Sequence, residues 1–441
     1  MTSSPMHDLA SRALELAKAA GASACRAHVS RDRSVEISYR AHKPETIKEA
    51  STLDLNLALF VDDRFSTQHT ADLRPEALAT FVKQAVAMTR LLAEDPLRTL
   101  PDPKYCAGRA TLDLAQADPA YAALTPDDRH AAVRAAEEAC LARGGDRVIS
   151  ATASISDERY ESVTLASNGF EGARDGTVFS LSAELTVHDE GERRANGYWY
   201  ASSHQRGGIP RPEEIGTRAA EETLRLTRAK KIKTETLPII IENWQAGQAL
   251  GGLMAAFNGR NIQQKQSFLA DKRGARFASD KLTLIDDPLL VGGLGSRLFD
   301  GEGLAAKRRV MVEAGVLREF FIDWYYSRKL GVEPTTGGAS NLIVVPGTRS
   351  VAEIMRDLGR GVVVNGFIGG NSNSTTGDFS IGITGALFER GEPVQNIAEM
   401  NIAGNHLEFW NRLVEVANDP WPYGSWRTPS LVFDGVVVSG A

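Results

Sequence analysis

Residues 148–188, VISATASISDERYESVTLASNGFEGARDGTVFSLSAELTVH, carry the clearest structural pattern in this sequence. Side chains alternate along two parts of this segment, which is typical of β-strands that present one face to a core. Asn168-Gly169 and Asp175-Gly176 are dipeptides that favour tight turns, so the segment predicts strands joined by hairpins. The alternating positions are Ile149, Ala151, Ala153 and Ile155, followed by Val178, Ser180, Ser182 and Glu184.

Further strands and several helices surround this segment. Leucine occupies every second position from Leu53 to Leu59, and this period of two predicts another half-buried strand. Thr125 is placed as an N-cap, with Pro126 at the first helical position and Asp128 in the capping-box position. The expected elements are strands over 35–39, after a turn at 31–34, and over 53–61, before the turn 62–64, with helices over 9–20, 75–93, 125–143 and 212–228.

The second half of the chain has a different texture. A buried strand is expected at Leu237–Ile241, after a basic stretch, and another at Val362–Val364. Runs of strands with a few helices at their ends, without regular alternation, predict an α+β fold. We therefore expect an N-terminal α+β domain over 1–233 and a C-terminal β-rich domain over 234–441. Sharp turns are expected at Gly292-Gly293, Gly337-Gly338 and Gly369-Gly370-Asn371.

Composition limits the classes of function. The 441 residues are 42% hydrophobic and 24% charged, with a net charge of −6, as in a globular protein without a concentrated positive surface. This balance argues against nucleic acid or an anionic membrane as the main partner. No apolar run approaches the roughly 18 residues of a membrane span, and the start shows no signal peptide, so we expect a cytoplasmic protein.

The residues that usually carry chemistry form few recognisable patterns. The eight histidines include no pair at i and i+4, and the three cysteines are widely spaced. One set of acidic residues stands out around a glycine-rich turn. This set predicts either a hard-cation or acid–base site or side chains that cap turns. Its members are Asp286, Asp287, Asp300 and Glu302.

The second half contains six short motifs in a distinctive order: Ser267–Leu269, Phe299–Gly303, Glu313–Leu317, Ser327–Gly331, Gly377–Ser380 and Ile402–Asn405. Their order and spacing, which match over about 200 residues, resemble the TldD/PmbA family, whose second member is also called TldE. The first half fits more loosely, through Leu57–Val61 and the helix that contains Ala85.

This resemblance implies a cytoplasmic zinc peptidase assembled from a TldD-like and a TldE-like chain. In the TldD-like chain, a helix with His-Glu-x-x-x-His and a later cysteine would hold the zinc, and the Glu would act as general base. The matching segment here, Gln245–Asn258, contains neither His nor Glu, and no cysteine follows Cys140. The sequence is therefore similar to the TldE member, which implies no catalytic residue and no metal in this chain, and zinc in its partner.

We expect two loops to contact the TldD-like partner or the peptide substrate. They contain Phe299, Asp300 and Glu302, and Gly377, Asp378, Phe379 and Ser380. Two alternatives remain open at this point. The chain could form a homodimer that binds peptides or a regulatory partner without cleaving them, or it could be an independent hydrolase that uses Asp286, Asp287, Asp300 and Glu302.

Overall fold

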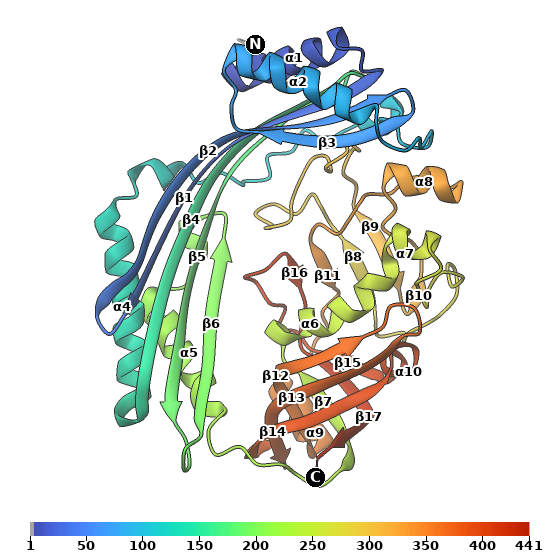
Figure 1. The fold of residues 1–441 in the computed structure, drawn as a ribbon. Coiled ribbons are helices and arrows are strands. Elements are labelled where there is room, and N and C mark those ends of the chain that lie inside the picture. Colours follow the sequence, from blue (N-terminus) through green and yellow to red (C-terminus); the bar gives the residue numbers. More distant parts are fainter. Residues whose placement is uncertain (1–3, 441) are drawn as a thin grey trace.

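The computed structural model describes residues 4–440. Two parts of the chain lie outside the described residues: Met1 to Ser3 and Ala441. The first belongs to the segment in which no signal peptide is expected, and the second is the last residue of the predicted C-terminal domain. The N-terminal half is built on an antiparallel sheet of long, curved strands in the order β3-β2-β1-β4-β5-β6 (Figure 1). Its strands are β1 (Ala24–Arg40), β2 (Lys43–Val61), β3 (Arg64–Thr70), β4 (Val148–Ala166), β5 (Glu171–His188) and β6 (Arg194–Ser203).

The hairpin between β4 and β5 confirms one predicted turn and corrects another. Asn168-Gly169 lies in the connection, where Gly169 takes a positive φ of 88°. The turn predicted at Asp175-Gly176 is wrong, because both residues continue β5, with Gly176 opposite Tyr160. A Cβ at Gly176 would lie 2.3 Å from the Tyr160 hydroxyl, so this glycine makes room for a ring and does not reverse the chain.

The turn predicted at residues 31–34 is also wrong. These residues continue β1, which pairs with β2 along one edge and with β4 along the other. Two complete ladders of backbone hydrogen bonds outweigh the local preference of a short polar sequence for a turn. The turn after residue 61 is confirmed, since Asp62 and Asp63 both take positive φ between β2 and β3.

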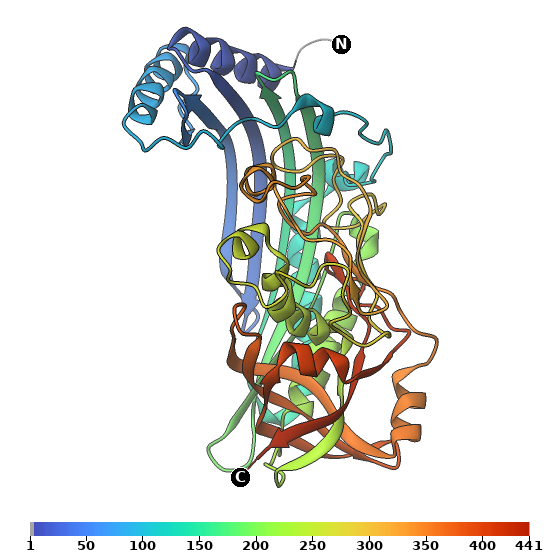
Figure 2. The same cartoon turned by 90° about the vertical axis from the view of Figure 1, so that its right-hand side faces the viewer.

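Helices cover the convex side of the sheet, and the C-terminal half lies on its concave side (Figures 1 and 2). The predicted capping box is confirmed, because the Thr125 hydroxyl accepts from the Asp128 N–H while the Asp128 carboxylate accepts from the Thr125 N–H. The helices of this half are α1 (Pro5–Ala19) and α2 (Pro75–Thr89) at one end, α4 (Pro126–Gly144) and α5 (Pro212–Arg225) at the other, and the short α3 (Pro103–Cys106) between them.

The C-terminal half contains two sheets around the largest apolar core, and the α+β class predicted for the chain is confirmed. The larger sheet has the order β14-β13-β12-β7-β17-β15, and the smaller has the order β10-β9-β8-β11-β16. The larger comprises β7 (Glu235–Ile241), β12 (Arg360–Ser372), β13 (Asp378–Glu389), β14 (Glu392–Asn405), β15 (Leu413–Val416) and β17 (Leu431–Ser439). The smaller comprises β8 (Leu284–Asp286), β9 (Arg309–Glu313), β10 (Val316–Leu317), β11 (Leu342–Val344) and β16 (Trp426–Arg427).

The helices of the C-terminal half are α6 (Asn243–Met254), α7 (Gly259–Gln263), α8 (Trp324–Leu330), α9 (Val351–Leu358) and α10 (His406–Asn411). The turn predicted at Gly369-Gly370-Asn371 is wrong, because these residues form an irregular part of β12. A Cβ at Gly370 would lie 2.6 Å from the Ser380 carbonyl oxygen, so the glycine allows two backbones to approach closely. Among residues 4–440, no helix combines the length and apolar character needed to cross a bilayer.

Candidate functional site

Helix α6 is the segment to which the family resemblance assigns the metal motif. Its polar side chains are amides and an indole, and its middle is occupied by small residues. A Cβ at Gly252 would lie 3.1 Å from the His406 ring and 3.3 Å from the Ser372 hydroxyl. A glycine therefore stands at the position of α6 that faces the nearest imidazole.

His406 lies in an aromatic setting beside α6. Its Nε2 is 2.8 Å from the Ser372 hydroxyl, while its Nδ1 is buried without a hydrogen-bond partner. The ring stacks on Phe268 at 5.6 Å and packs against Phe379 at 4.9 Å. Burial lowers the pKa of His406 to about 4, so the imidazole is neutral at physiological pH.

The donors beside α6 do not fit zinc, which takes four N, S or O ligands in structural sites and three protein ligands in catalytic ones. One imidazole and one hydroxyl meet there, and the facing helix adds no further imidazole, thiolate or carboxylate. Within the described residues, no group of three or more His, Cys, Asp or Glu side chains is arranged to hold a metal ion.

The predicted contact loop Gly377–Ser380 lies next to this region. Phe379 is buried between His406 and Phe409, so its ring belongs to the local core. Asp378 accepts hydrogen bonds from Thr376 and Asn405, and Gly377 forms the turn with a φ of 86°. Ser380 accepts a hydrogen bond from the side chain of Asn401 at 3.2 Å.

The other predicted contact loop joins the two halves of the chain. Phe299 is buried against Phe170 of the N-terminal half, with ring centroids 5.1 Å apart. One Asp300 oxygen accepts from the backbone N–H groups of Glu302 and Leu304. A Glu302 oxygen accepts from the Trp324 N–H at 2.8 Å. No hydrogen bond or ring contact among residues 4–440 connects this loop with Gly377–Ser380.

The acidic side chains of the hydrolase alternative accept hydrogen bonds from different parts of the protein. Asp286 accepts from both the N–H and the hydroxyl of Ser340, and burial raises its pKa. Asp287 accepts from the Leu289 N–H in the same turn. Asp287 and Asp300 therefore cap turns, whereas Asp286 accepts from the distant Ser340 and keeps one buried oxygen without a hydrogen-bond partner.

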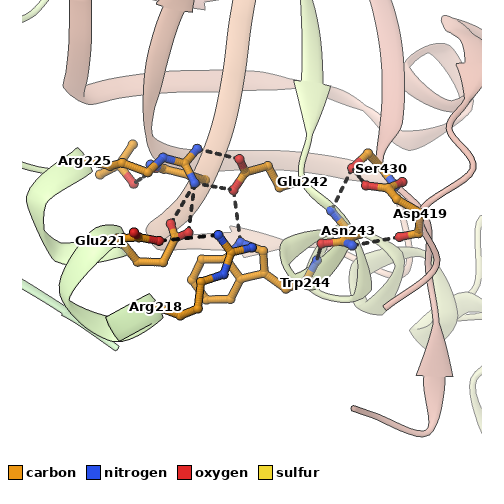
Figure 3. A network of polar contacts seen from close by, with 11 residues as sticks. Arg218, Glu221, Arg225, Glu242, Asn243, Trp244, Asp419 and Ser430 are labelled. Carbon is orange, nitrogen blue, oxygen red and sulfur yellow. Dashed lines mark hydrogen bonds and ion pairs between the residues drawn. The ribbon is translucent and has the colours of Figure 1, made fainter. Parts of the chain in front are cut away.

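A groove of about 920 Å³ opens at the start of α6. It is bounded by α5 and β6 of the N-terminal half and by the segment 419–430 (Figures 1 and 3). Arg225 of α5 forms ion pairs with Glu222, at 2.8 Å, and with Glu242, at 2.5 Å. The Trp244 indole N–H donates to Glu242 at 3.0 Å, so the helix start is tied to α5.

On the opposite side of the groove, Asn243 connects α6 to the C-terminal segment. Its N–H donates to the Ser430 hydroxyl at 3.0 Å, and its side-chain amide donates to the Asp419 carbonyl at 2.7 Å. The Ser430 hydroxyl in turn donates to the Asp419 carboxylate at 2.7 Å. Figure 3 shows that the two networks meet at consecutive residues, Glu242 to Trp244.

Aromatic rings line the same groove. Trp199 of β6 packs edge-on against Trp421, at 5.4 Å, and Tyr423, at 5.5 Å. Burial raises the pKa of Glu222, although the adjacent Arg225 acts in the opposite direction. No local sequence pattern predicts this groove, because its residues lie far apart in the chain. Three of the six tryptophans, Trp199, Trp244 and Trp421, line it.

Fold and site together define an α+β protein with three sheets among the described residues and a helix α6 that carries no metal ligands. Residues 234–440 match the PmbA/TldA metallopeptidase C-terminal domain, and residues 120–227 match the central domain of the same family. The chain is 30% identical over 442 residues to metalloprotease PmbA of Escherichia coli O157:H7, across 99% of this chain and 96% of that protein. The chain therefore belongs to the PmbA/TldD metallopeptidase family.

Two solved structures share this fold, and a further relative carries the TldD name. A candidate modulator of DNA gyrase from Bacteroides thetaiotaomicron is 38% identical, with a TM-score of 0.96 over 99% of this chain and all of that one. TldE from Thermococcus kodakarensis has the same fold, with a TM-score of 0.86 at 22% identity over 98% of this chain and all of that one. A metalloprotease TldD homolog from Buchnera aphidicola is 25% identical over 63% of each chain.

Proposed function

We propose that this chain is the non-catalytic, TldE-like subunit of a cytoplasmic TldD/TldE-type zinc metallopeptidase that degrades or trims peptides. The observation that carries the proposal is the residue content of α6, where glycines and amides occupy the segment that would bear the metal ligands. His406 beside it is neutral, stacked and bonded to a serine, which suits packing. Zinc and the general base would come from the TldD-like partner.

The groove at the start of α6 supports a part in holding the peptide. Its volume of about 920 Å³ lies in the range of ligand pockets, and its walls combine aromatic rings with charged groups. The half-buried ring of Trp244 offers apolar area at little entropic cost. The Arg225 and Asn243 networks hold the groove walls to the start of α6.

The test is reconstitution with the TldD-like chain of the same organism. We expect a stoichiometric complex and faster hydrolysis of an unfolded peptide than by the TldD-like chain alone. This chain alone, with zinc added, should release no product. Unchanged activity and stability of the TldD-like chain would contradict the proposal.

A matched pair of variants tests whether the groove contributes to peptide binding. Trp244→Ala removes a half-buried ring that lines the groove, whereas Trp324→Ala removes a half-buried ring on α8, outside the groove. Both variants should still form the complex, which is measured first. We expect only Trp244→Ala to raise the KM for the peptide, and equal effects of both variants would argue against the groove.

A further inference from the structure

A second pocket, of about 390 Å³, lies between the concave face of the long sheet and the loop at Phe299–Gly301. The sheet register places the residues that form the floor of this pocket next to one another. Arg26 and His28 are two residues apart on β1, and His28 is opposite Thr164 of β4. Arg174 of β5 lies opposite Ser162, two residues from Thr164, so its side chain reaches the same face.

Two guanidinium groups in this pocket form no close ion pair with a carboxylate, although Asp300 attracts both and Glu302 attracts Arg26. Within residues 4–440, the Arg26 side chain makes no hydrogen bond and no ion pair, although it is only partly exposed. Arg174 donates one N–H to the Phe299 carbonyl and lies 4.4 Å from that ring, while its Nε is buried without a partner. Burial lowers the pKa of both side chains, which is the mark of poorly solvated charge.

Neutral polar groups complete the floor. The Nδ1 of His28 is 2.8 Å from the Thr164 hydroxyl, and burial together with Arg174 and Arg26 lowers the pKa of His28. Asn56 of β2 and Thr67 of β3 line the pocket as well. These hydroxyl, amide and imidazole groups can donate hydrogen bonds to an oxygen ligand.

The acidic side chains near the pocket accept hydrogen bonds from other residues or are partly protonated. Asp300 lines the pocket, but its oxygens accept hydrogen bonds from Glu302, Leu304 and Thr336. Burial raises the pKa of Glu302 to about 7, so much of this side chain is uncharged at neutral pH. Arg297 adds positive potential at Arg174. The positive charge of the pocket therefore exceeds the negative charge.

We propose that this pocket binds a small oxyanion, a carboxylate or a phosphate, between Arg26 and Arg174. A desolvated charge without a partner is unfavourable, and a guanidinium group forms paired hydrogen bonds to either kind of anion. The two sources are the terminal carboxylate of a short peptide and a free or esterified phosphate. The site lies apart from α6 and from the large groove, so the proposal does not depend on the subunit role.

The experiment measures calorimetric binding to the full chain in a low-salt buffer. The probes are inorganic phosphate and a pair of N-acetylated tripeptides, one with a free C-terminal carboxylate and one with a C-terminal amide. We expect a dissociation constant of about 1 mM or tighter for phosphate, for the free-acid peptide, or for both, and no binding of the amide. Phosphate binding alone would identify a phosphate site, and competition between both probes would identify a general oxyanion site.

Variants connect binding to the two arginines. Arg26→Gln and Arg174→Gln should each weaken binding by about tenfold or more, because each removes a charged hydrogen-bond donor. The control is Arg12→Gln on α1, where the arginine is exposed and paired with Glu15 at 3.3 Å. Absence of binding by the wild type, equal binding of the amide peptide, or equal affinity of the control and pocket variants would overturn the proposal.

A thermal unfolding measurement distinguishes a variant that has lost the binding site from a variant that folds less stably. In buffer free of oxyanions, Arg26→Gln should melt at the same temperature as the wild type or higher, because burial disfavours the Arg26 charge by more than the attraction of Glu302 and Asp300 offsets. Added phosphate should then raise the melting temperature of the wild type but not of the variant. A variant that melts lower in that buffer would show that Arg26 is structural and would count against the site.

Discussion

The two loops singled out by sequence contain or adjoin ionisable side chains whose pKa values burial shifts in opposite directions. Beside Gly377–Ser380, burial lowers the pKa of His406 to about 4, and aromatic rings enclose the neutral imidazole. Beside Phe299–Gly301, burial raises the pKa of Glu302 to about 7, and unpaired guanidinium groups lie close by. The first region has the character of a packed core, whereas the second keeps uncompensated charge, which is a mark of functional sites.

The largest expected effect tests the packed character of the first region. Phe379→Ala removes a buried ring that contacts both His406 and Phe409, so we expect unfolding free energy to fall by about 3–5 kcal/mol. Denaturant unfolding of the isolated chain measures it. A stable Phe379→Ala chain that no longer binds the TldD-like partner would instead support the contact role predicted for this loop.

The next effect concerns pH and the second region. The folded pKa of Glu302 lies above its ordinary value of 4.5, so folding favours its protonated form. Its contribution to stability is present below about pH 4.5 and is lost as the pH rises through about 7. Glu302→Gln should remove about 1–3 kcal/mol of this fall, measured by unfolding at a series of pH values. An unchanged pH profile would refute the raised pKa.

His406 should act in the opposite direction over nearly the same range. Its folded pKa lies below the ordinary value of 6.5, so its contribution is present above about pH 6.5 and is lost as the pH falls toward about 4. In His406→Gln, the acid destabilisation should be smaller by about 1–3 kcal/mol. The imidazole resonances of the wild type, followed by NMR titration, give the pKa directly, and a value near 6.5 would contradict the buried, neutral state.

The smallest effect separates two neighbouring glycines of α6. A Cβ at Gly251 meets only ordinary contacts, at 3.8 Å and beyond, whereas a Cβ at Gly252 crowds His406 and Ser372. Gly251→Ala should therefore stabilise the chain by about 0.5–1 kcal/mol through helix propensity. Gly252→Ala should gain less or lose stability. Equal gains in thermal unfolding would show that the His406 side of α6 has free space.

Local sequence patterns predicted the helices, strands and turns well where the backbone conformation did not depend on pairing with neighbouring strands. The capping box at Thr125 and the turn at Asn168-Gly169 were predictable because both depend on a few adjacent residues. The turns expected at 31–34 and at Asp175-Gly176 failed because strand pairing decided those backbones. For the site, the missing ligands of α6 could be read directly, whereas the groove at Trp199 and Trp421 joins residues far apart in the chain.

The sequence by itself determined the α+β class and the lack of metal ligands on α6, because period, capping and residue type are local properties. Only the tertiary structure decided which charges share a pocket. Arg26 and Arg174 meet because β1 and β5 both pair with β4 in a fixed register. Only the folded loop shows that one Asp300 oxygen accepts hydrogen bonds from the loop backbone and the other from Thr336, so that neither guanidinium group forms an ion pair with this carboxylate.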